Sequence, residues 1–180
     1  MLQIKAITPD DTALWDAFVS LYTEAFPECE RRPVVSIERL ARESGKFRVN
    51  AIEKEGSFAG FITCWDLGEF AYVEHFAIVP SMRSGGLGGE IIDATTANAG
   101  KTVILEAETA TDEMSRRRLG FYVRHGFAIC PQPYRQPAYT PQQSSLPMHI
   151  LSYGRALDDS EFADIRDTIY ETVYNTTVER

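Results

Sequence analysis

Cysteine is scarce in this 180-residue chain, and its three cysteines are far apart, at Cys29, Cys64 and Cys130. An odd number of cysteines without a Cys-x-x-Cys pair argues against a disulfide framework and a zinc motif. We therefore expect reduced thiols, a cytoplasmic protein and no bound metal. The sequence also lacks an apolar run long enough to cross a membrane and a basic-then-apolar leader, so we expect no membrane partner.

Basic residues are also few, because 18 Lys and Arg face 26 Asp and Glu, which leaves a net charge of −8. The phosphates of a nucleic acid would repel such a chain, so we expect no nucleic-acid partner. The same charge favours a cationic small molecule or peptide as a ligand through long-range attraction. The length is suited to one domain, spanning residues 1–180, with a substantial core.

A glycine-rich segment, Arg83-Ser84-Gly85-Gly86-Leu87-Gly88-Gly89-Glu90, is the centre of the functional interpretation. The aromatic and β-branched residues of Ala71–Val79 predict a strand before it. Leu87, Ile91 and Ile92 have near-helical spacing and predict a helix after it, to about residue 98. A glycine turn at a helix N-terminus presents bare N–H groups, so the segment predicts a phosphate-binding site.

Two nucleotide-binding motifs fit this segment poorly. A Walker A loop ends in Gly-Lys-Ser/Thr, but Gly88 is followed by Gly89 and Glu90. A dinucleotide fingerprint that starts at Gly86 and Gly88 needs a third glycine where Ile91 stands. A nucleotide-binding protein therefore remains as a rival hypothesis. The segment could also be an ordinary flexible turn without a ligand.

The pattern Arg-x-x-Gly-x-Gly over Arg83–Gly88 resembles the coenzyme A pyrophosphate loop of the GNAT (GCN5-related) N-acetyltransferases. A second segment, Ser115–Phe127, is similar to another motif of this family, because Tyr122 precedes Gly126-Phe127 as in Tyr-x-x-x-Gly-Phe. The resemblance covers roughly residues 70 to 130. Asn and Ala of the family pattern are replaced by Ser115 and Arg118, which puts the finer coenzyme contacts in doubt.

The fold class that the resemblance implies is α/β, with a mixed, twisted, mostly antiparallel sheet of about seven strands and helices on both faces. Hydrophobic patterns in the sequence agree with alternating strands and helices. The expected strands are 2–7, 47–53, 57–65, 70–78, 101–107, 127–130 and 148–153. The expected helices are 11–25, 36–43 with Ser36 as N-cap, 87–98, 112–125 and an appended C-terminal helix at about 158–175. Five prolines predict a loop without regular structure at 131–147.

The resemblance implies acetyl-CoA as the acyl-donor cosubstrate. The loop would bind its diphosphate, and the backbone of the preceding strand would pair with its pantetheine amides. The residues expected to contact it are Phe76, Ala77, Ile78, Arg83, Ser84, Gly85, Gly86, Leu87 and Gly88.

Two residues are candidates for catalysis. Tyr122 matches the family position whose hydroxyl lies near the coenzyme sulfur and can protonate the leaving thiolate; otherwise it is a packed core tyrosine. Glu74 shares a strand face with Tyr72, Phe76 and Ile78, and a carboxylate among aromatic residues needs a partner or a function. We expect Glu74 to deprotonate the amine, directly or through water, with a salt bridge to an arginine as the equal alternative.

Acceptor contacts are predicted at Glu30, Arg31, Tyr72 and Tyr139, where solvated or loop-anchoring side chains are the alternative. The hypothesis is an N-acetyltransferase that moves an acetyl group from acetyl-CoA to a primary amine of a small molecule or peptide by direct attack. A non-catalytic acyl-CoA-binding sensor or scaffold is the alternative. The C-terminal helix could also mediate a homodimer. The sequence does not identify the acceptor.

Overall fold

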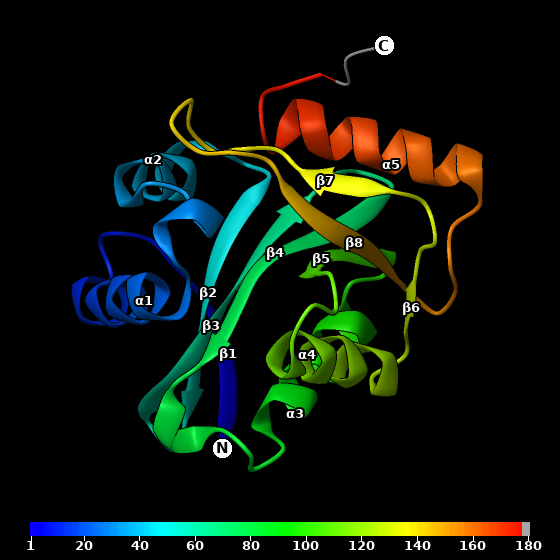
Figure 1. Cartoon of the computed structure of the whole chain (residues 1–180). Coiled ribbons are helices and arrows are strands. Elements are labelled where there is room, and N and C mark those ends of the chain that lie inside the picture. Colours follow the sequence, from blue (N-terminus) through cyan, green and yellow to red (C-terminus); the bar gives the residue numbers. More distant parts are fainter. Residues whose placement is uncertain (178–180) are drawn as a thin grey trace. The chain divides into compact units, whose positions relative to one another are not determined.

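The computed structural model describes residues 1–177, which form eight strands and five α-helices (Figure 1). The strands are β1 (Leu2–Ile7), β2 (Phe47–Lys54), β3 (Ser57–Asp66), β4 (Phe70–Ile78), β5 (Thr102–Glu108), β6 (Phe127–Ile129), β7 (Tyr134–Gln136) and β8 (Leu146–Tyr153). The helices are α1 (Thr12–Ala25), α2 (Val34–Glu43), α3 (Leu87–Asn98), α4 (Glu113–Arg124) and α5 (Asp159–Thr172). The strands belong to one sheet, mostly antiparallel, so the predicted α/β class is confirmed, with eight strands instead of about seven.

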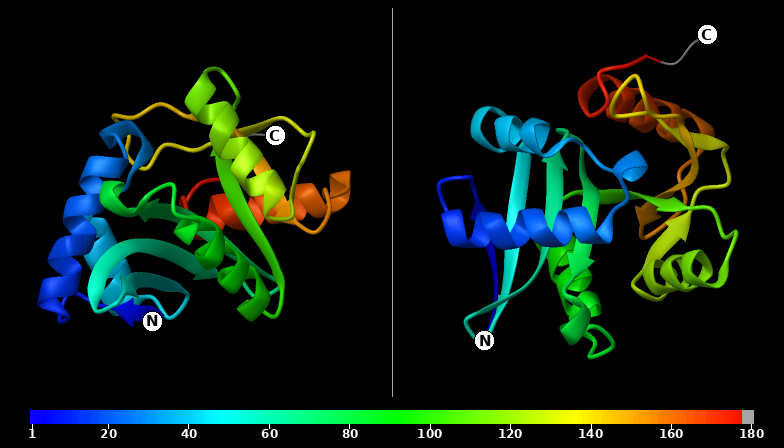
Figure 2. Two further views of the ribbon diagram at one scale, coloured as in Figure 1. Left: turned by 90° about the horizontal axis from the view of Figure 1, so that it is seen from below. Right: turned by 60° about the vertical axis from the view of Figure 1, so that its left-hand side comes forward.

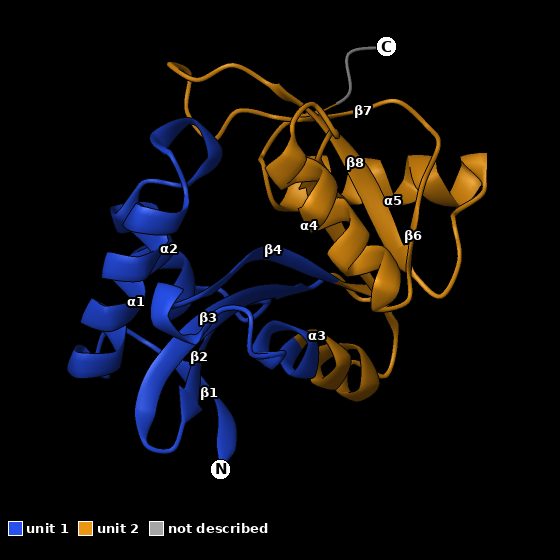
Figure 3. Cartoon of the chain, turned by 60° about the horizontal axis from the view of Figure 1, so that its bottom comes forward, with its two compact units in different colours: residues 1–66, 72–91 blue, residues 67–71, 92–180 orange. Residues whose placement is uncertain are grey.

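The chain divides into two compact units, coloured separately in Figure 3. Unit 1 contains residues 1–66 and 72–91, and unit 2 contains residues 67–71 and the chain from residue 92 onward. The three boundaries fall at the end of β3, after the first two residues of β4 and inside α3. The expectation of a single domain stays a prediction.

In unit 1 the strands follow one another in the order β1-β2-β3-β4. β1 pairs antiparallel with β2, so that Leu2 lies opposite Lys54, and β2 pairs antiparallel with β3. The β2–β3 hairpin turns at Glu55 and Gly56, whose φ angles are 55° and 81°. Positive φ at both central residues is the requirement of a tight two-residue hairpin turn.

Helices α1 and α2 pack on β3 and β2 (Figure 2). The apolar stripe of α1 supplies Trp15, Phe18 and Tyr22, which are buried. The ring of Phe18 meets the ring of Phe61 on β3 edge to face, with centroids 4.8 Å apart. Burial of such large aromatic side chains stabilises the packing of α1 on β3.

In unit 2 strand β8 is the central element, because it pairs antiparallel with β5, β6 and β7. Ile104 of β5 lies opposite Ser152 of β8, and Ala128 of β6 lies opposite the same residue. Helix α4 packs against β5 and β6. No helix within residues 1–177 is both long and apolar enough to cross a membrane.

Two local predictions are wrong. The proline-rich segment 131–147 was expected to lack regular structure, but Tyr134–Gln136 forms β7 and β8 already begins at Leu146. Pro133 lies just before β7, and Pro147 lies within β8 opposite Arg135 of this short strand. Helix α2 begins at Val34 with Pro33 at the N-cap, so Ser36 is not the cap.

Candidate functional site

The glycine loop of unit 1 joins the short 3₁₀ turn Pro80–Met82 to α3. Ser84 and Gly86 have φ angles of 67° and 80°, in the left-handed region. Glu90 N donates to Gly86 O at 3.1 Å, which is the first hydrogen bond of the helix. The N–H groups that precede Glu90 have no acceptor one turn back within the helix and make its N-terminus a site for an anion.

Gly85 and Gly86 have open space around them, since a Cβ added at either position would meet no heavy atom within 4 Å. Position 86 favours glycine because its φ angle is positive. Gly85 has no positive φ, and no atom lies close enough to exclude a side chain there. Neither the backbone angle nor close packing therefore requires glycine at position 85, and no side chain covers the backbone there.

The loop is held at both ends by apolar packing. Leu87 and Ile91 at the start of α3 pack with Ile78 at the end of β4, together with Ile52 and Ala59. Leu87 is buried, so its side chain serves the core and only its backbone can reach a ligand.

The end of β4 approaches β3 closely. A Cβ added at Gly60 would lie 2.3 Å from Ala77 O and 3.0 Å from the Ile78 Cα. Arg83 Nε donates to Ile78 O at 2.9 Å, so the structure brings two predicted coenzyme-binding residues together. The backbone at Ala77 and Ile78 therefore contacts both Gly60 and the Arg83 side chain.

The Glu74 carboxylate of β4 has two hydrogen-bond donors. Arg32 Nε donates to Oε1 at 2.8 Å, and Trp65 Nε1 donates to Oε2 at 2.7 Å. The Arg32 guanidinium also lies over the Trp65 ring, 5.6 Å from its centroid. Glu74 therefore forms a salt bridge with an arginine, which was the predicted alternative to a role as catalytic base. The sequence did not point to Arg32, although it stands next to the predicted pair Glu30 and Arg31.

The predicted acceptor residues of unit 1 are engaged in the fold. Arg31 Nε donates to Phe26 O at 3.1 Å, and Tyr72 is fully buried. Glu30 O lies 3.1 Å from Nε2 of His75. Burial is the main cause that lowers the pKa of His75, and this keeps the imidazole neutral at pH 7. His75 is therefore a neutral, buried residue of the core.

In unit 2 Tyr122 lies on the buried face of α4, between the rings of Phe121 and Phe127. Burial raises the pKa of Tyr122 to about 12. The phenol therefore keeps its proton at neutral pH and has it available to donate.

Ser115, which replaces the family's Asn, has a structural role. Its backbone N donates to Asp112 Oδ1 at 2.8 Å, and its Oγ accepts from Asp112 N at 3.1 Å. This reciprocal pair is a capping box that satisfies donors at the start of α4. The second departure, Arg118, forms an ion pair with Glu108 of β5.

A carboxylate that the sequence analysis missed lies on β5. Glu106 accepts hydrogen bonds from the hydroxyl of Tyr134, from Gln136 Nε2 at 2.7 Å and from Tyr174 OH at 2.9 Å. Tyr139, a predicted acceptor contact, has its hydroxyl 3.4 Å from that of Tyr174. The sequence did contain a signal for Glu106, because an acidic residue stands in the apolar run of β5. The same reasoning had identified Glu74 as a candidate.

No group of three or more His, Cys, Asp or Glu side chains within the described residues is arranged to hold a metal ion. Predicted site residues thus form separate groups. Unit 1 holds the loop and Glu74, whereas unit 2 holds Tyr122 and the cluster around Glu106.

Comparison with known proteins supplies independent findings. Residues 12–127 match the family model described as Acetyltransferase (GNAT) family. A solved structure from Bacteroides thetaiotaomicron, assigned to the same family, is 32% identical over 97% of this chain and 99% of that chain, with a TM-score of 0.93. No curated protein matches the sequence.

More distant structures share the fold alone. The Escherichia coli ribosomal-protein-S18-alanine N-acetyltransferase is 17% identical, with a TM-score of 0.60 over 88% of this chain and 96% of that chain. A Bacillus subtilis acetyltransferase in complex with CoA is 16% identical, with a TM-score of 0.58 over 85% and 98%. A spermidine N-acetyltransferase chimera that includes Vibrio cholerae sequence is 14% identical, with a TM-score of 0.61 over 84% and 94%.

Proposed function

Because this chain belongs to the GNAT acetyltransferase family, we propose that it transfers an acetyl group from acetyl-CoA to a primary amine of a small molecule or peptide. The observation that carries the proposal is the loop Arg83–Gly88. Its glycines Gly85 and Gly86 have open space around them, and the N–H groups at the start of α3 have no acceptor within the helix. Such a loop suits the diphosphate of the donor. The CoA complex of a fold neighbour supports the same class of donor.

The end of β4 would hold the pantetheine arm through the backbone of Phe76, Ala77 and Ile78. Arg83 Nε donates to Ile78 O, and its exposed side chain is also next to the proposed diphosphate loop. We infer that Arg83 supplies positive charge to the diphosphate when the donor binds. This contact would be charge-assisted and therefore stronger than a neutral hydrogen bond.

In the proposed reaction the neutral amine nitrogen attacks the thioester carbonyl carbon, the C–N bond forms and the C–S bond breaks. Tyr122 donates its phenolic proton to the leaving thiolate. Its pKa, raised to about 12 by burial, keeps that proton available at neutral pH. Solvent then restores the proton on the phenol.

Glu74 is the proposed base, taking the proton of the amine directly or through water. Arg32 and Trp65 hold its carboxylate in a single orientation through bonds of 2.8 and 2.7 Å. Such fixed positioning favours proton transfer with little reorganisation. We further propose that the Glu106 carboxylate, surrounded by Tyr134, Gln136 and Tyr174, attracts the cationic acceptor.

One observation favours the alternative of a non-catalytic acyl-CoA-binding sensor or scaffold. The Glu74 side chain is only 1% exposed and is ion-paired, as a purely structural carboxylate would be. A sensor would bind acetyl-CoA and leave the thioester intact with every amine. The two functions therefore differ in turnover and not in donor binding.

The test combines calorimetry with an acceptor screen. Calorimetry compares acetyl-CoA, CoA and ATP, and we expect heat with the first two and none with ATP. The screen follows free CoA thiol with amino acids, spermidine and an alanine-terminated peptide, since the fold neighbours are named for the latter two acceptors. Binding without thiol release across the panel would favour the sensor. Absence of donor binding would overturn both functions.

A further inference from the structure

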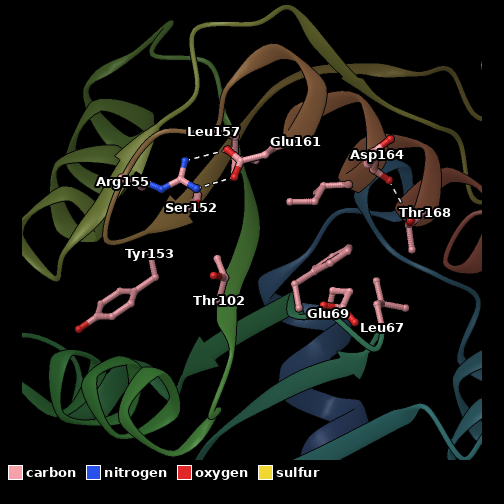
Figure 4. Close-up of a pocket in the computed structure, with 12 residues that line it drawn as sticks. Leu67, Glu69, Thr102, Ser152, Tyr153, Arg155, Leu157, Glu161, Asp164 and Thr168 are labelled. Carbon is pink, nitrogen blue, oxygen red and sulfur yellow. Dashed lines mark hydrogen bonds and ion pairs between the residues drawn. The ribbon is translucent and has the colours of Figure 1, made fainter.

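Unit 2 contains a cavity of about 370 Å³ beneath the first half of α5 (Figure 4). Its floor includes Thr102 of β5 and Ser152 of β8, which lie on the same sheet face because Ser152 is opposite Ile104. The walls come from the turn and the start of β4 and from α5, with the lining residues Leu67, Glu69, Phe70, Glu161, Asp164, Ile165 and Thr168. This volume lies within the range of small-molecule sites.

Much of the lining is apolar. Phe70 and Leu157 are buried core residues that also border the cavity, and Leu67 and Ile165 border it from the turn and from α5. A ligand that fills this space therefore gains affinity by removing an apolar body from water.

The floor also carries an unsatisfied polar group. The Oγ atom of Ser152 is buried and has no hydrogen-bond partner among the described residues. A buried hydroxyl without a partner is costly and calls for a specific explanation. A serine hydroxyl rotates about one bond, so a polar atom of a bound ligand can pair with it.

The charges around the cavity are mainly negative. Arg155 forms an ion pair with Glu161, so these two lining charges offset each other. The nearby Lys101 ammonium donates to Gly68 O at 2.7 Å and lies outside the lining. The two remaining charged groups of the lining are the exposed carboxylates of Glu69 and Asp164. Neither carboxylate has a hydrogen-bond or ion-pair partner in the described part of the chain.

From this combination we infer a second ligand site, in which the cavity binds a small organic cation with an apolar body. The apolar body lies against Phe70 and Ile165, and the cationic end faces Glu69 and Asp164. None of the lining residues is itself assigned to acetyl transfer, since Phe70 lies at the start of β4 and the proposed donor contacts lie at its other end. The site is therefore independent of the proposed function.

The probe is benzyltrimethylammonium, whose quaternary nitrogen has no lone pair and cannot accept an acetyl group. Binding to the full chain is followed by calorimetry and by NMR shifts of the Leu67 and Ile165 methyl groups. We expect saturable binding with one site, shifts at both methyl groups and no binding of phenylacetate, an anion of similar size. Absence of saturation, or equal binding of phenylacetate, would overturn the inference.

Variants locate the binding. The double variant Glu69→Gln, Asp164→Asn should weaken binding at least fivefold, because it removes both carboxylate charges and little volume. The control Glu113→Gln removes an exposed carboxylate of α4 and should leave the affinity unchanged. Ile165→Trp should abolish binding by filling the cavity. If that variant does not fold, the charge variant still decides, and an unchanged affinity in it would disprove the site.

Discussion

The Nε atom of Arg32 lies 2.8 Å from Oε1 of Glu74, and the two side chains are only 12% and 1% exposed. The pair joins the connector after α1 to the middle of β4, 42 residues later in the sequence. Trp65 on β3 supplies a second donor to the same carboxylate. Three separate segments of unit 1 are thus tied to one buried charge.

Glu74→Ala should lower the free energy of unfolding by about 3 kcal/mol, because it leaves the Arg32 guanidinium buried without its carboxylate. Urea denaturation measures the change. A double-mutant cycle with Arg32→Ala should give a smaller loss than the sum of the single losses. Strict additivity would show that the pair contributes no coupling. Glu113→Ala, which breaks an exposed pair on α4, is the control and should leave stability nearly unchanged.

Gly60→Ala should destabilise the protein by about 3 kcal/mol, because the new Cβ would lie 2.3 Å from the carbonyl oxygen of Ala77. Backbone cannot move aside as a flexible side chain can. The thermal midpoint and urea denaturation report the loss. The matched control is Gly45→Ala. A Cβ at this position meets no heavy atom within 4 Å, so the substitution should be tolerated. Equal stability of the two variants would refute the close approach of β3 and β4.

Gly85→Ala should leave the thermal midpoint within a degree or two and weaken acetyl-CoA binding about tenfold. The space around Gly85 is open, so a methyl group does not strain the fold. It would instead occupy the approach of the diphosphate to the backbone. Calorimetry with acetyl-CoA measures the affinity. Unchanged affinity would remove the loop from the proposed donor site.

Tyr122→Phe should lower kcat at least tenfold on a productive acceptor and leave the affinity for acetyl-CoA unchanged. The substitution removes the proposed acid and keeps the buried ring. Unchanged turnover would assign the hydroxyl no catalytic role.

Tyr122 also predicts alkaline behaviour. Its folded pKa is raised to about 12, above the ordinary value of 10.0, so the folded state holds the proton more tightly than the unfolded state. The resulting stability is fully present below pH 10 and is lost as the pH rises towards 12. Tyr122→Phe should therefore show a shallower fall of unfolding free energy over this window. An identical slope in both proteins would contradict the assignment.

Glu106→Gln should raise the KM for a cationic acceptor about tenfold and leave acetyl-CoA affinity unchanged. The amide keeps much of the shape that Tyr134 and Tyr174 contact, but it lacks the negative charge. A neutral amine acceptor should show a smaller effect, which separates charge recognition from a folding defect. Equal effects on both acceptors would assign Glu106 a structural role.

Several helices and strands could be predicted from patterns of neighbouring residues in the sequence. The strand before the glycine segment and the helix after it are each specified by neighbouring residues, and the structure contains both. Strand β7 was missed because it depends on pairing with β8 and not on its own three residues, which lie in a proline-rich segment.

Long-range partners could not be predicted. Glu74 was recognised as a carboxylate in need of a partner, but only the fold selects Arg32 over its neighbour Arg31. The cluster around Glu106 likewise gathers residues that are 28 to 68 positions away in sequence. The position of a carboxylate in an apolar strand indicates that it needs a hydrogen-bond or ion-pair partner. Tertiary packing decides which side chain is that partner.

Arg135 ties the two ends of the segment after β7 together, since its Nε and Nη2 atoms donate to the Oγ and carbonyl oxygen of Ser145 at 2.9 and 2.7 Å. Inside this closed ring, Tyr139 N and Thr140 N both donate to Gln143 Oε1. These hydrogen bonds restrain the conformation of the segment. A molecule that meets Tyr139 gains its contacts with little loss of chain entropy, so recognition there should be rigid and selective for shape.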